Sequence, residues 1–147
     1  MARITRVFLD TNVIFSGLYS ASGAPARIID LYAEGRITVV VSQLVLDELV
    51  AALKAKRPAI LPVLLDLLTS TLPEIVADPP SAEVARWLPV IHDSDDAPIL
   101  AAAVAARPDA LVTGNTRHFL DNPEVARQSG LRIMTPAQFM ASTLLDA

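Results

Sequence analysis

Three short segments of this 147-residue chain place acidic side chains where a buried strand ends or a helix begins. Asp10 directly follows a short apolar run, Glu48 lies in a segment of helical pattern, and Asp96 closes an acidic turn. In an open α/β sheet, ligands bind beyond the carboxyl ends of the strands, and carboxylates that meet there repel one another unless a cation lies between them. Mg²⁺ and Mn²⁺ are hard cations that take such oxygen ligands. The pattern therefore indicates a metal-dependent hydrolase site.

Each acid also has a purely structural interpretation. Asp is a good helix N-cap, so Asp10 alone is a weak signal. The turn 93–96 holds three aspartates, more than the cap of one helix requires, which favours a cation. The apolar seam around Glu48 is formed by four residues: Leu46, Leu49, Val50 and Leu53. At ~100° per residue Glu48 falls opposite this seam, so periodicity alone predicts an exposed side chain.

Composition narrows the class of protein. With 147 residues, of which 52% are apolar, the chain can bury a sizeable core, and we expect one domain spanning residues 1–147. The absence of cysteine excludes disulfides and thiolate metal sites and fits a reducing cytoplasm. The N-terminal stretch is too short for a signal sequence, and no apolar run approaches the ~18 residues of a membrane span. We therefore expect a cytoplasmic protein with no membrane association.

The charge balance is acidic, with a net charge of −4 and a pI near 5.0. This argues against a protein that holds nucleic acid by electrostatics alone. It is compatible with a nuclease, because bound metal ions reverse the local sign of acidic groups. Basic residues cluster at Lys54, Lys56 and Arg57, and Arg117 lies beside His118. Such groups are either solvated helix ends or weak candidates for RNA contacts.

Strand-like apolar runs alternate with helical patterns along the chain. Five runs predict strands: 7–9, 37–41, 74–77, 110–113 and 131–134. Ser42 is a good cap for the helix that follows it, and Thr135 with Gln138 forms a capping box. Pro98 must lie in the first turn of a helix over 97–106, which makes Ser94 or Asp95 the expected cap. Strands separated by helices imply a mostly parallel sheet with helices on both faces.

Other catalytic classes lack their motifs. No second His and no Cys stands at zinc-site spacing from His118, which is either a packing residue or a ligand. There is no Gly-x-Ser-x-Gly elbow and no phosphate-binding glycine loop. Serine-nucleophile hydrolases and nucleotide kinases are therefore excluded.

Four motifs, in their order along the chain, resemble those of the PIN-domain family. The matching segments are Phe8–Val13, Ser42–Leu49, Asp96–Ala103 and Leu111–Asn115. The resemblance runs from Val7 to the helix start at Thr135, and within the family the chain looks like the bacterial toxins of type II toxin–antitoxin pairs, which are called VapC-like. It implies a three-layer α/β/α domain with a five-stranded parallel sheet. It also implies cleavage of RNA that depends on Mg²⁺ or Mn²⁺.

The resemblance also assigns residues to roles. The catalytic metal ligands would be Asp10, Glu48 and Asp96. The supporting polar residues would be Thr11, Asn12, Thr113 and His118. Many members of the family carry a fourth acid in the turn after the fourth strand, where this chain has Asn115. A second metal would then depend on Asn115, Asp93 and substrate phosphates, with Asp121 as the nearest acid in reserve.

Three functions are compatible with these residues. The first is a toxin ribonuclease that is inhibited by a small antitoxin protein. The second is a degenerate PIN fold that binds RNA or protein without cutting, which the Asn115 replacement suggests. The third is a phosphohydrolase with Asp10 as nucleophile, but that chemistry needs a second aspartate two residues on, where Asn12 stands.

The segment 60–72 carries more leucine than one core-facing seam can use. Because a monomer rarely exposes such a patch, we expect this segment to form a homodimer, to bind an inhibitor, or both. The alternative is a helix held between its neighbour over 44–53 and the sheet, which would hide the leucines.

Overall fold

A five-stranded parallel sheet organises the computed structural model, which describes residues 3–145. The spatial order of its strands is β3-β2-β1-β4-β5. Their bounds are β1 (Thr5–Leu9), β2 (Ile37–Ser42), β3 (Glu74–Val76), β4 (Ala110–Val112) and β5 (Ile133–Met134). β1, β2 and β4 are short, apolar and largely buried, as expected of parallel strands that are covered on both faces. All five predicted strands are therefore present, and the last is shorter than predicted.

Helices make every connection between consecutive strands. β1 is joined to β2 by α1 (Thr11–Tyr19) and α2 (Ala24–Ala33), and β2 to β3 by α3 (Gln43–Lys56), the 3₁₀ turn η1 (Pro58–Ile60) and α4 (Leu61–Ser70). β3 is joined to β4 by α5 (Ser81–Ile91) and α6 (Ala97–Ala106), and β4 to β5 by α7 (Thr116–Phe119) and α8 (Pro123–Ser129). The chain closes with α9 (Pro136–Ala141) and η2 (Thr143–Leu145). Within residues 3–145, no helix has both the length and the apolar character that crossing a membrane would need.

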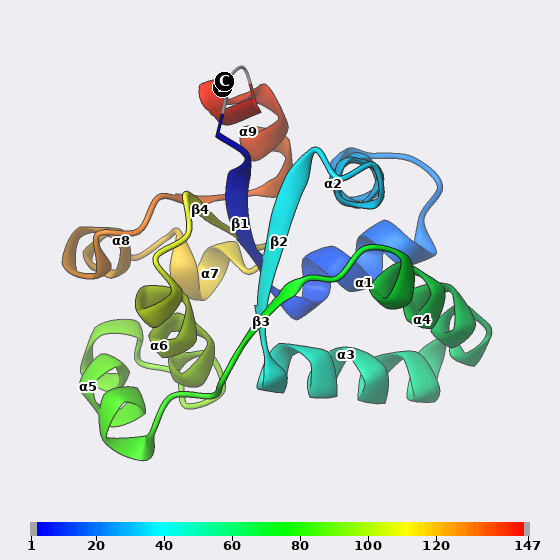
Figure 1. Cartoon of the computed structure of the whole chain (residues 1–147). Helices are drawn as coiled ribbons and strands as arrows, with labels where there is room; N and C mark the ends of the chain where they lie inside the picture. The colour runs from blue at the N-terminus through cyan, green and yellow to red at the C-terminus, as the bar shows by residue number, and fades with distance from the viewer. Residues whose placement is uncertain (1–2, 146–147) are drawn as a thin grey trace.

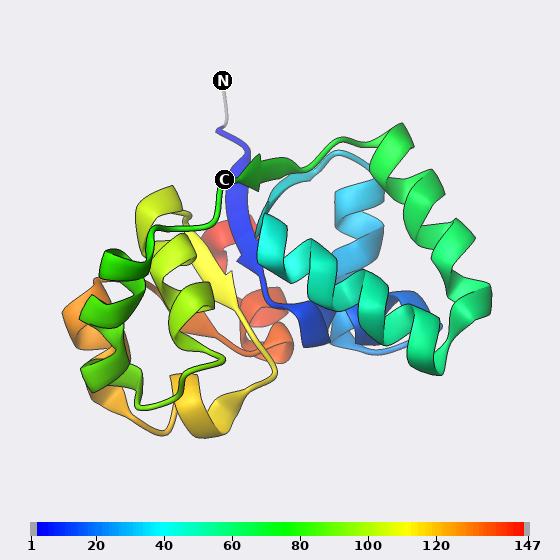
Figure 2. The same ribbon diagram turned by 90° about the horizontal axis from the view of Figure 1, so that it is seen from below.

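The helices form two layers, one on each side of the sheet. From β1 to β3 successive strands are added in one direction, whereas β4 and β5 are added on the other side of β1. Because parallel crossovers are right-handed, the two sets of connecting helices lie on opposite faces. Figure 1 and Figure 2 show this separation, with α1–α4 on one side and α5–α8 on the other. The predicted three-layer α/β/α fold is confirmed.

Local start and stop signals act largely as the sequence predicts. The Ser42 hydroxyl accepts a hydrogen bond from the Val45 amide at 3.2 Å, and both bonds of the Thr135–Gln138 capping box form. Gly35 follows α2 with a φ of 72°, a conformation that favours glycine. α5 carries Pro89 within it and continues to Ile91.

The leucine-rich helix α4 is only partly hidden. Leu64 is 1% exposed, whereas Val63, Leu65 and Leu72 are 48%, 54% and 81% exposed. The alternative in which packing hides all the leucines is wrong for Leu65 and Leu72, and association through the exposed side chains stays a prediction. Val63 and Leu65 flank Leu64 on its two sides, about 200° apart on α4, and Leu72 follows the end of the helix; we call these three exposed side chains together the leucine face.

Candidate functional site

The site is built where two neighbouring strands end together. Leu9 of β1 is in register with Val112 of β4, so the residues that follow them lie side by side. Asp10 donates its backbone N–H to the Val112 carbonyl at 3.1 Å, and the Thr113 hydroxyl donates to Asp10 Oδ2 at 2.8 Å. The parallel sheet thus brings together side chains that are about a hundred positions apart in the sequence.

Asp10 is both a helix cap and a buried acid. Its side chain is held by the Thr11 N–H, which donates to Oδ1 at 2.8 Å, and by Asn12 Nδ2, which donates to Oδ2 at 3.3 Å. The residue is only 6% exposed. Burial raises the pKa of Asp10, and the hydrogen bonds from Thr113, Thr11 and Asn12 oppose this shift. Asp10 therefore caps α1, and its role as a metal ligand stays a prediction that this cap does not exclude.

Glu48 reaches the same edge from α3. The Thr11 hydroxyl donates to Glu48 Oε2 at 3.1 Å, while the backbone of Thr11 holds Asp10. The pKa of Glu48 is raised, mainly by partial burial, and the charges of Asp10, Asp95 and Asp96 add to the shift. The hydrogen bond from Thr11 opposes it. One threonine thus joins two carboxylates.

The predicted seam of α3 was misplaced. The buried residues of this helix are Val45, Leu49 and Leu53, whereas Leu46 and Val50 are half-buried. At ~100° per residue, this places Glu48 on the flank of the buried face instead of opposite to it. The side chain is exposed, as periodicity predicted, but it lies beside the neighbouring helix α1 and contacts Thr11.

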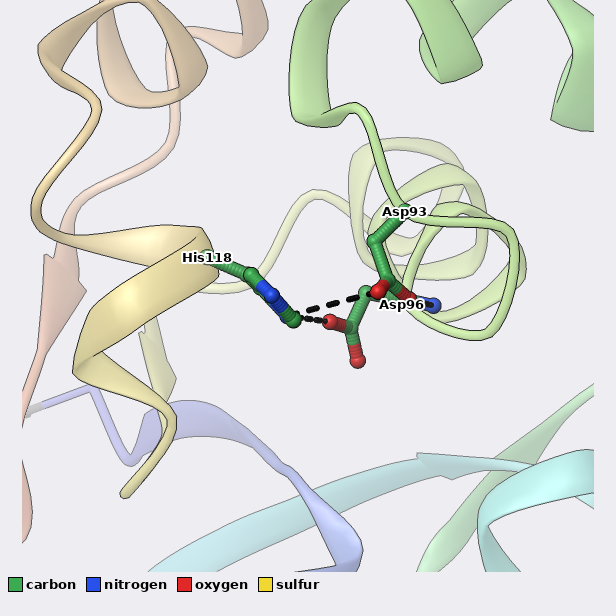
Figure 3. Close-up of side chains that lie close together, drawn as sticks. All are labelled: Asp93, Asp96 and His118. Atoms are coloured by element: carbon green, nitrogen blue, oxygen red, sulfur yellow. Dashed lines mark hydrogen bonds and ion pairs between the residues drawn. The ribbon is translucent and has the colours of Figure 1, made fainter.

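Asp96 is held by two residues that follow β4. Asn115 Nδ2 donates to Asp96 Oδ2 at 3.0 Å, and His118 Nδ1 lies 2.5 Å from the same oxygen. Figure 3 shows the imidazole of His118 directed at the carboxylates of Asp96 and Asp93. Burial raises the pKa of Asp96; the His118 hydrogen bond opposes the shift, and the charges of Asp93 and Asp10 add to it.

Asp93, and not Ser94 or Asp95, caps the turn that leads into α6. Asp93 Oδ1 accepts the backbone N–H groups of Asp95 and Asp96, both at 2.9 Å, and its carbonyl accepts the N–H of Ala97. The bond from the Asp96 N–H is the main reason why the pKa of Asp93 is lowered. The expected cap was wrong because the chain already turns at 94–96, before the helix proper begins. As a result, the Asp96 side chain is released from capping and faces Asn115 and His118.

A continuous chain of hydrogen bonds connects the three predicted ligands. Thr11 bonds both Glu48 and Asp10, and Thr113 bonds Asp10 and accepts the Asn115 N–H at 3.0 Å. Asn115 then bonds Asp96. Neutral donors are thus interleaved between the carboxylates, which stabilises acids that would otherwise repel one another.

The most compact group of potential metal ligands differs from the predicted set. Among the described residues, Asp93, Asp96 and His118 offer ligand atoms that all lie within 4.8 Å of one another. The carboxylates of Asp10 and Glu48 lie on the same edge but outside this compact group. From the sequence His118 is either a packing residue or a ligand, and the family resemblance implies a supporting role. Its spacing of three residues from Asn115 places both residues at the start of α7.

The donor set fits a hard divalent cation. Among residues 3–145, no hydrogen bond reaches Oε1 of Glu48 or Oδ1 of Asp96, while the other oxygen of each carboxylate is held in place. Carboxylate oxygens suit Mg²⁺ and Mn²⁺, and an imidazole nitrogen is accepted by the transition metal more readily than by Mg²⁺. The raised pKa values of Asp10, Glu48 and Asp96 mean that ionising these carboxylates costs free energy in the folded protein. A bound cation would lower this cost.

Of the remaining predicted residues, Asn12 and Asn115 form hydrogen bonds within the site, and the others are exposed and outside it. Asn12 Oδ1 accepts the Gly114 N–H at 2.9 Å, so it connects the turn after β4 to α1. The Asn115 side-chain oxygen accepts the His118 N–H at 3.2 Å, so its role as a ligand stays a prediction that would require this oxygen to turn away. The other predicted residues are exposed: Asp121, Lys54, Lys56, Arg57 and Arg117.

A sequence model of the PIN domain matches residues 6–117, about three quarters of the chain. The chain belongs to the PIN domain family. The predicted resemblance is thereby confirmed at the level of the family. Among curated proteins, none matches this sequence.

Several solved structures share the fold. VapBC2 from Rickettsia felis, bound to a DNA fragment from its promoter, has 20% identity and a TM-score of 0.62, covering 88% of this chain and 98% of that chain. DNA-bound VapBC from Salmonella typhimurium has 20% identity and a TM-score of 0.63, covering 90% and 99%. A toxin–antitoxin complex from Klebsiella pneumoniae has 22% identity and a TM-score of 0.59, covering 88% and 97%. At these identities the similarity establishes the shared fold.

The Asp10→Asn variant tests whether Asp10 carries a burial cost. Because burial raises the folded-state pKa of Asp10 above its ordinary value of 3.8, the metal-free protein loses stability as the pH rises through this raised pKa. We expect Asp10→Asn to raise the free energy of unfolding at pH 7.5 by on the order of 1 kcal/mol, with the gain shrinking toward pH 4. Thermal or urea unfolding across this pH range measures it.

The matched control is Asp66→Asn, at an exposed acid on α4. This variant should unfold like the wild type throughout the pH range. If metal-free Asp10→Asn is less stable than the wild type at pH 7.5, the cap of α1 outweighs the burial cost, and the acid is structural.

Proposed function

We propose that this chain is a metal-dependent endoribonuclease and the toxin of a type II toxin–antitoxin pair. The observation that carries the proposal is the edge of the sheet where Asp10, Glu48 and Asp96 are joined through neutral donors. Within the described residues 3–145, Oε1 of Glu48 and Oδ1 of Asp96 accept no hydrogen bond and are available to a cation. Membership of the PIN family and the fold shared with VapBC complexes support it. The proposal includes a single domain and a cytoplasmic location, where RNA is available.

The proposed chemistry needs no protein nucleophile. Mg²⁺ or Mn²⁺ held by Asp10, Glu48 and Asp96 would polarise a phosphoryl oxygen and lower the pKa of a bound water. Thr113 and Asn12 fix the orientation of Asp10, while Thr11 does so for Glu48. Asn115 and His118 fix Asp96. These supports keep the carboxylates in place before the cation and the substrate arrive.

A degenerate PIN fold that binds without cutting is the second candidate. It is favoured by Asn115, which stands where many family members carry an acid and uses both ends of its amide within the protein. The phosphohydrolase alternative has less support, because the side chain two residues after Asp10 is an amide that bonds Gly114 and Asp10. Cleavage assays separate these candidates.

RNA cleavage should require a divalent metal and Asp96. We expect the purified protein to cut RNA with Mg²⁺ or Mn²⁺ and to stop in EDTA, and Asp96→Asn to lower the rate at least about 100-fold, because one ligand is lost. Gel analysis of labelled single-stranded RNA measures it. Asp66→Asn serves as the control and should cut like the wild type. Cleavage that continues in EDTA, or an Asp96→Asn variant of full activity, would contradict the proposal, and a wild type that binds RNA without cutting would favour the degenerate fold.

Asn115→Asp tests the missing fourth acid. An aspartate keeps the oxygen that accepts the His118 N–H but replaces the amide that donates to Asp96 with a carboxylate. If this position limits metal binding, Mn²⁺ affinity and the cleavage rate should both rise about tenfold, since a further charged oxygen ligand is added. Isothermal titration with Mn²⁺ and the RNA assay measure the two effects. An unchanged affinity would show that the site is complete through other acids, such as Asp93 or Asp121.

The leucine face should mediate association with a second copy or with an antitoxin. Because Leu64 is buried, its substitution would disturb the core, so Leu65→Lys and Leu72→Lys are the appropriate variants. If the face forms a homodimer, we expect the wild type to be dimeric and the double variant to be monomeric by size-exclusion chromatography with light scattering. Ala82→Lys, on α5 across the sheet, is the control. A wild type that is monomeric at high micromolar concentration would rule out the homodimer.

A further inference from the structure

A groove runs between α1 and α3 next to the candidate metal site. It has a volume of about 250 Å³ and is lined by Thr11, Asn12, Phe15 and Ser16 of α1 and by Ala52 and Lys56 of α3. Figures 1 and 2 both show the two helices side by side. Neither the proposed metal chemistry nor the hydrogen-bonded chain of carboxylates uses the outer part of this groove.

The inner end of the groove touches the proposed catalytic residues. Thr11 and Asn12 line it, and these two residues hold Asp10, while Thr11 also holds Glu48. Phe15 lies one helical turn, about 6 Å, further along α1. A substrate whose phosphodiester lies at the carboxylates would therefore have an adjoining nucleotide at the mouth of this groove.

The outer end is aromatic and positively charged. The rings of Phe15 and Tyr19 have centroids 6.4 Å apart. The Arg57 guanidinium lies over Tyr19 at 4.2 Å from the ring centroid and donates to its hydroxyl at 2.8 Å. Lys56 lines the groove itself. Exposed cations thus lie beyond the aromatic side chains, at the opposite end from the carboxylates.

This order of groups matches a single-stranded nucleic acid. Proteins that bind unpaired strands place bases against aromatic rings and phosphates against cations, and stacking tolerates any base. We propose that the groove between α1 and α3 is the subsite for the nucleotide next to the cleaved phosphodiester, with its unpaired base against Phe15 and the following phosphate at Lys56. The Ser16 hydroxyl supplies a hydrogen-bonding group beside the base. The inference rests on the proposed nuclease function and adds a requirement for an unpaired base.

Binding of RNA that is not cut tests the subsite. In the Asp96→Asn background, we expect Phe15→Leu to weaken binding of a single-stranded oligoribonucleotide by about 5- to 100-fold, because it removes the aromatic face and keeps apolar bulk. Phe15→Trp should bind within about threefold of the parent, since its ring also stacks. Lys56→Ala should weaken binding and reduce the slope of log Kd against log salt by about 0.7, the value for one phosphate contact on a single strand.

The matched control is Arg86→Ala, at an exposed cation of α5 that lies on the other side of the sheet and does not line the groove. It should leave the affinity for RNA unchanged. Fluorescence anisotropy with a labelled oligomer measures all variants, and melting temperatures confirm that each is folded. Because Lys56 is exposed, its variant gives an answer even if Phe15→Leu fails to fold.

Three outcomes would overturn the inference. If the wild type cleaves RNA but Phe15→Leu and Lys56→Ala bind like the parent, the nuclease function stands and the subsite lies elsewhere. If these variants bind RNA normally but lose a protein partner, the groove is a protein-binding surface. A wild type that does not cleave RNA, with a parent that does not bind it, would remove the proposed function and the subsite together.

Discussion

Like charges that are brought to one edge of a parallel sheet must be separated by donors or neutralised by a cation, and the arrangement of this edge follows from that constraint. The strands fix where the acids lie, because β1 and β4 end in register and Asp10 follows β1 directly. Thr11, Thr113 and Asn115 occupy the spaces between carboxylates. Each of the three donates to a carboxylate without adding a charge of its own, so the edge keeps the negative potential that a cation needs.

The same constraint applies to the turn 93–96, where Asp93 and Asp96 accept hydrogen bonds from different groups. Asp93 takes the two backbone N–H groups, and this lowers its pKa. Asp96 takes the side chains of Asn115 and His118. A helix start and the proposed ligand set require different orientations of a carboxylate, and in this turn Asp93 has the first orientation while Asp96 has one compatible with the second. Asp10 would combine capping with the proposed ligand role, because its two oxygens face different donors.

The sequence predicted the fold well, and the site less completely. β-Branched runs and capping residues are local signals, so the strands and the helix starts at Ser42 and Thr135 could be found. Periodicity predicted that Glu48 is exposed on α3. Its contact with Thr11 of α1 depends on how two helices pack that are separated along the chain by α2 and β2. The cap at Asp93 was missed because all four residues of the turn 93–96, three aspartates and a serine, are good capping residues by type. The proximity of His118 to Asp96 arises from a tight turn after β4, which no periodicity encodes.

The groove between α1 and α3 was beyond prediction for a related reason. Phe15, on α1, and Lys56, at the far end of α3, are about forty positions apart and belong to different helices. Each has an ordinary local explanation, Phe15 as an apolar residue packed against the core and Lys56 as a cation in the last turn of a helix. Only the adjacency of the helices makes them neighbours of Thr11. Local patterns therefore reveal the elements, and tertiary packing creates the combination of groups.

The turn between α5 and α6 also limits how this chain can change in length. Connecting loops usually accept insertions and deletions. Here the Asp93 carboxylate bonds the N–H groups two and three positions ahead, and Asp96 must still meet Asn115. One added residue would rotate the position of Asp96 by about 100° around the turn and carry its carboxylate away from His118. This short connection should therefore keep a constant length among functional relatives, while the exposed turn around 21–23 is free to vary.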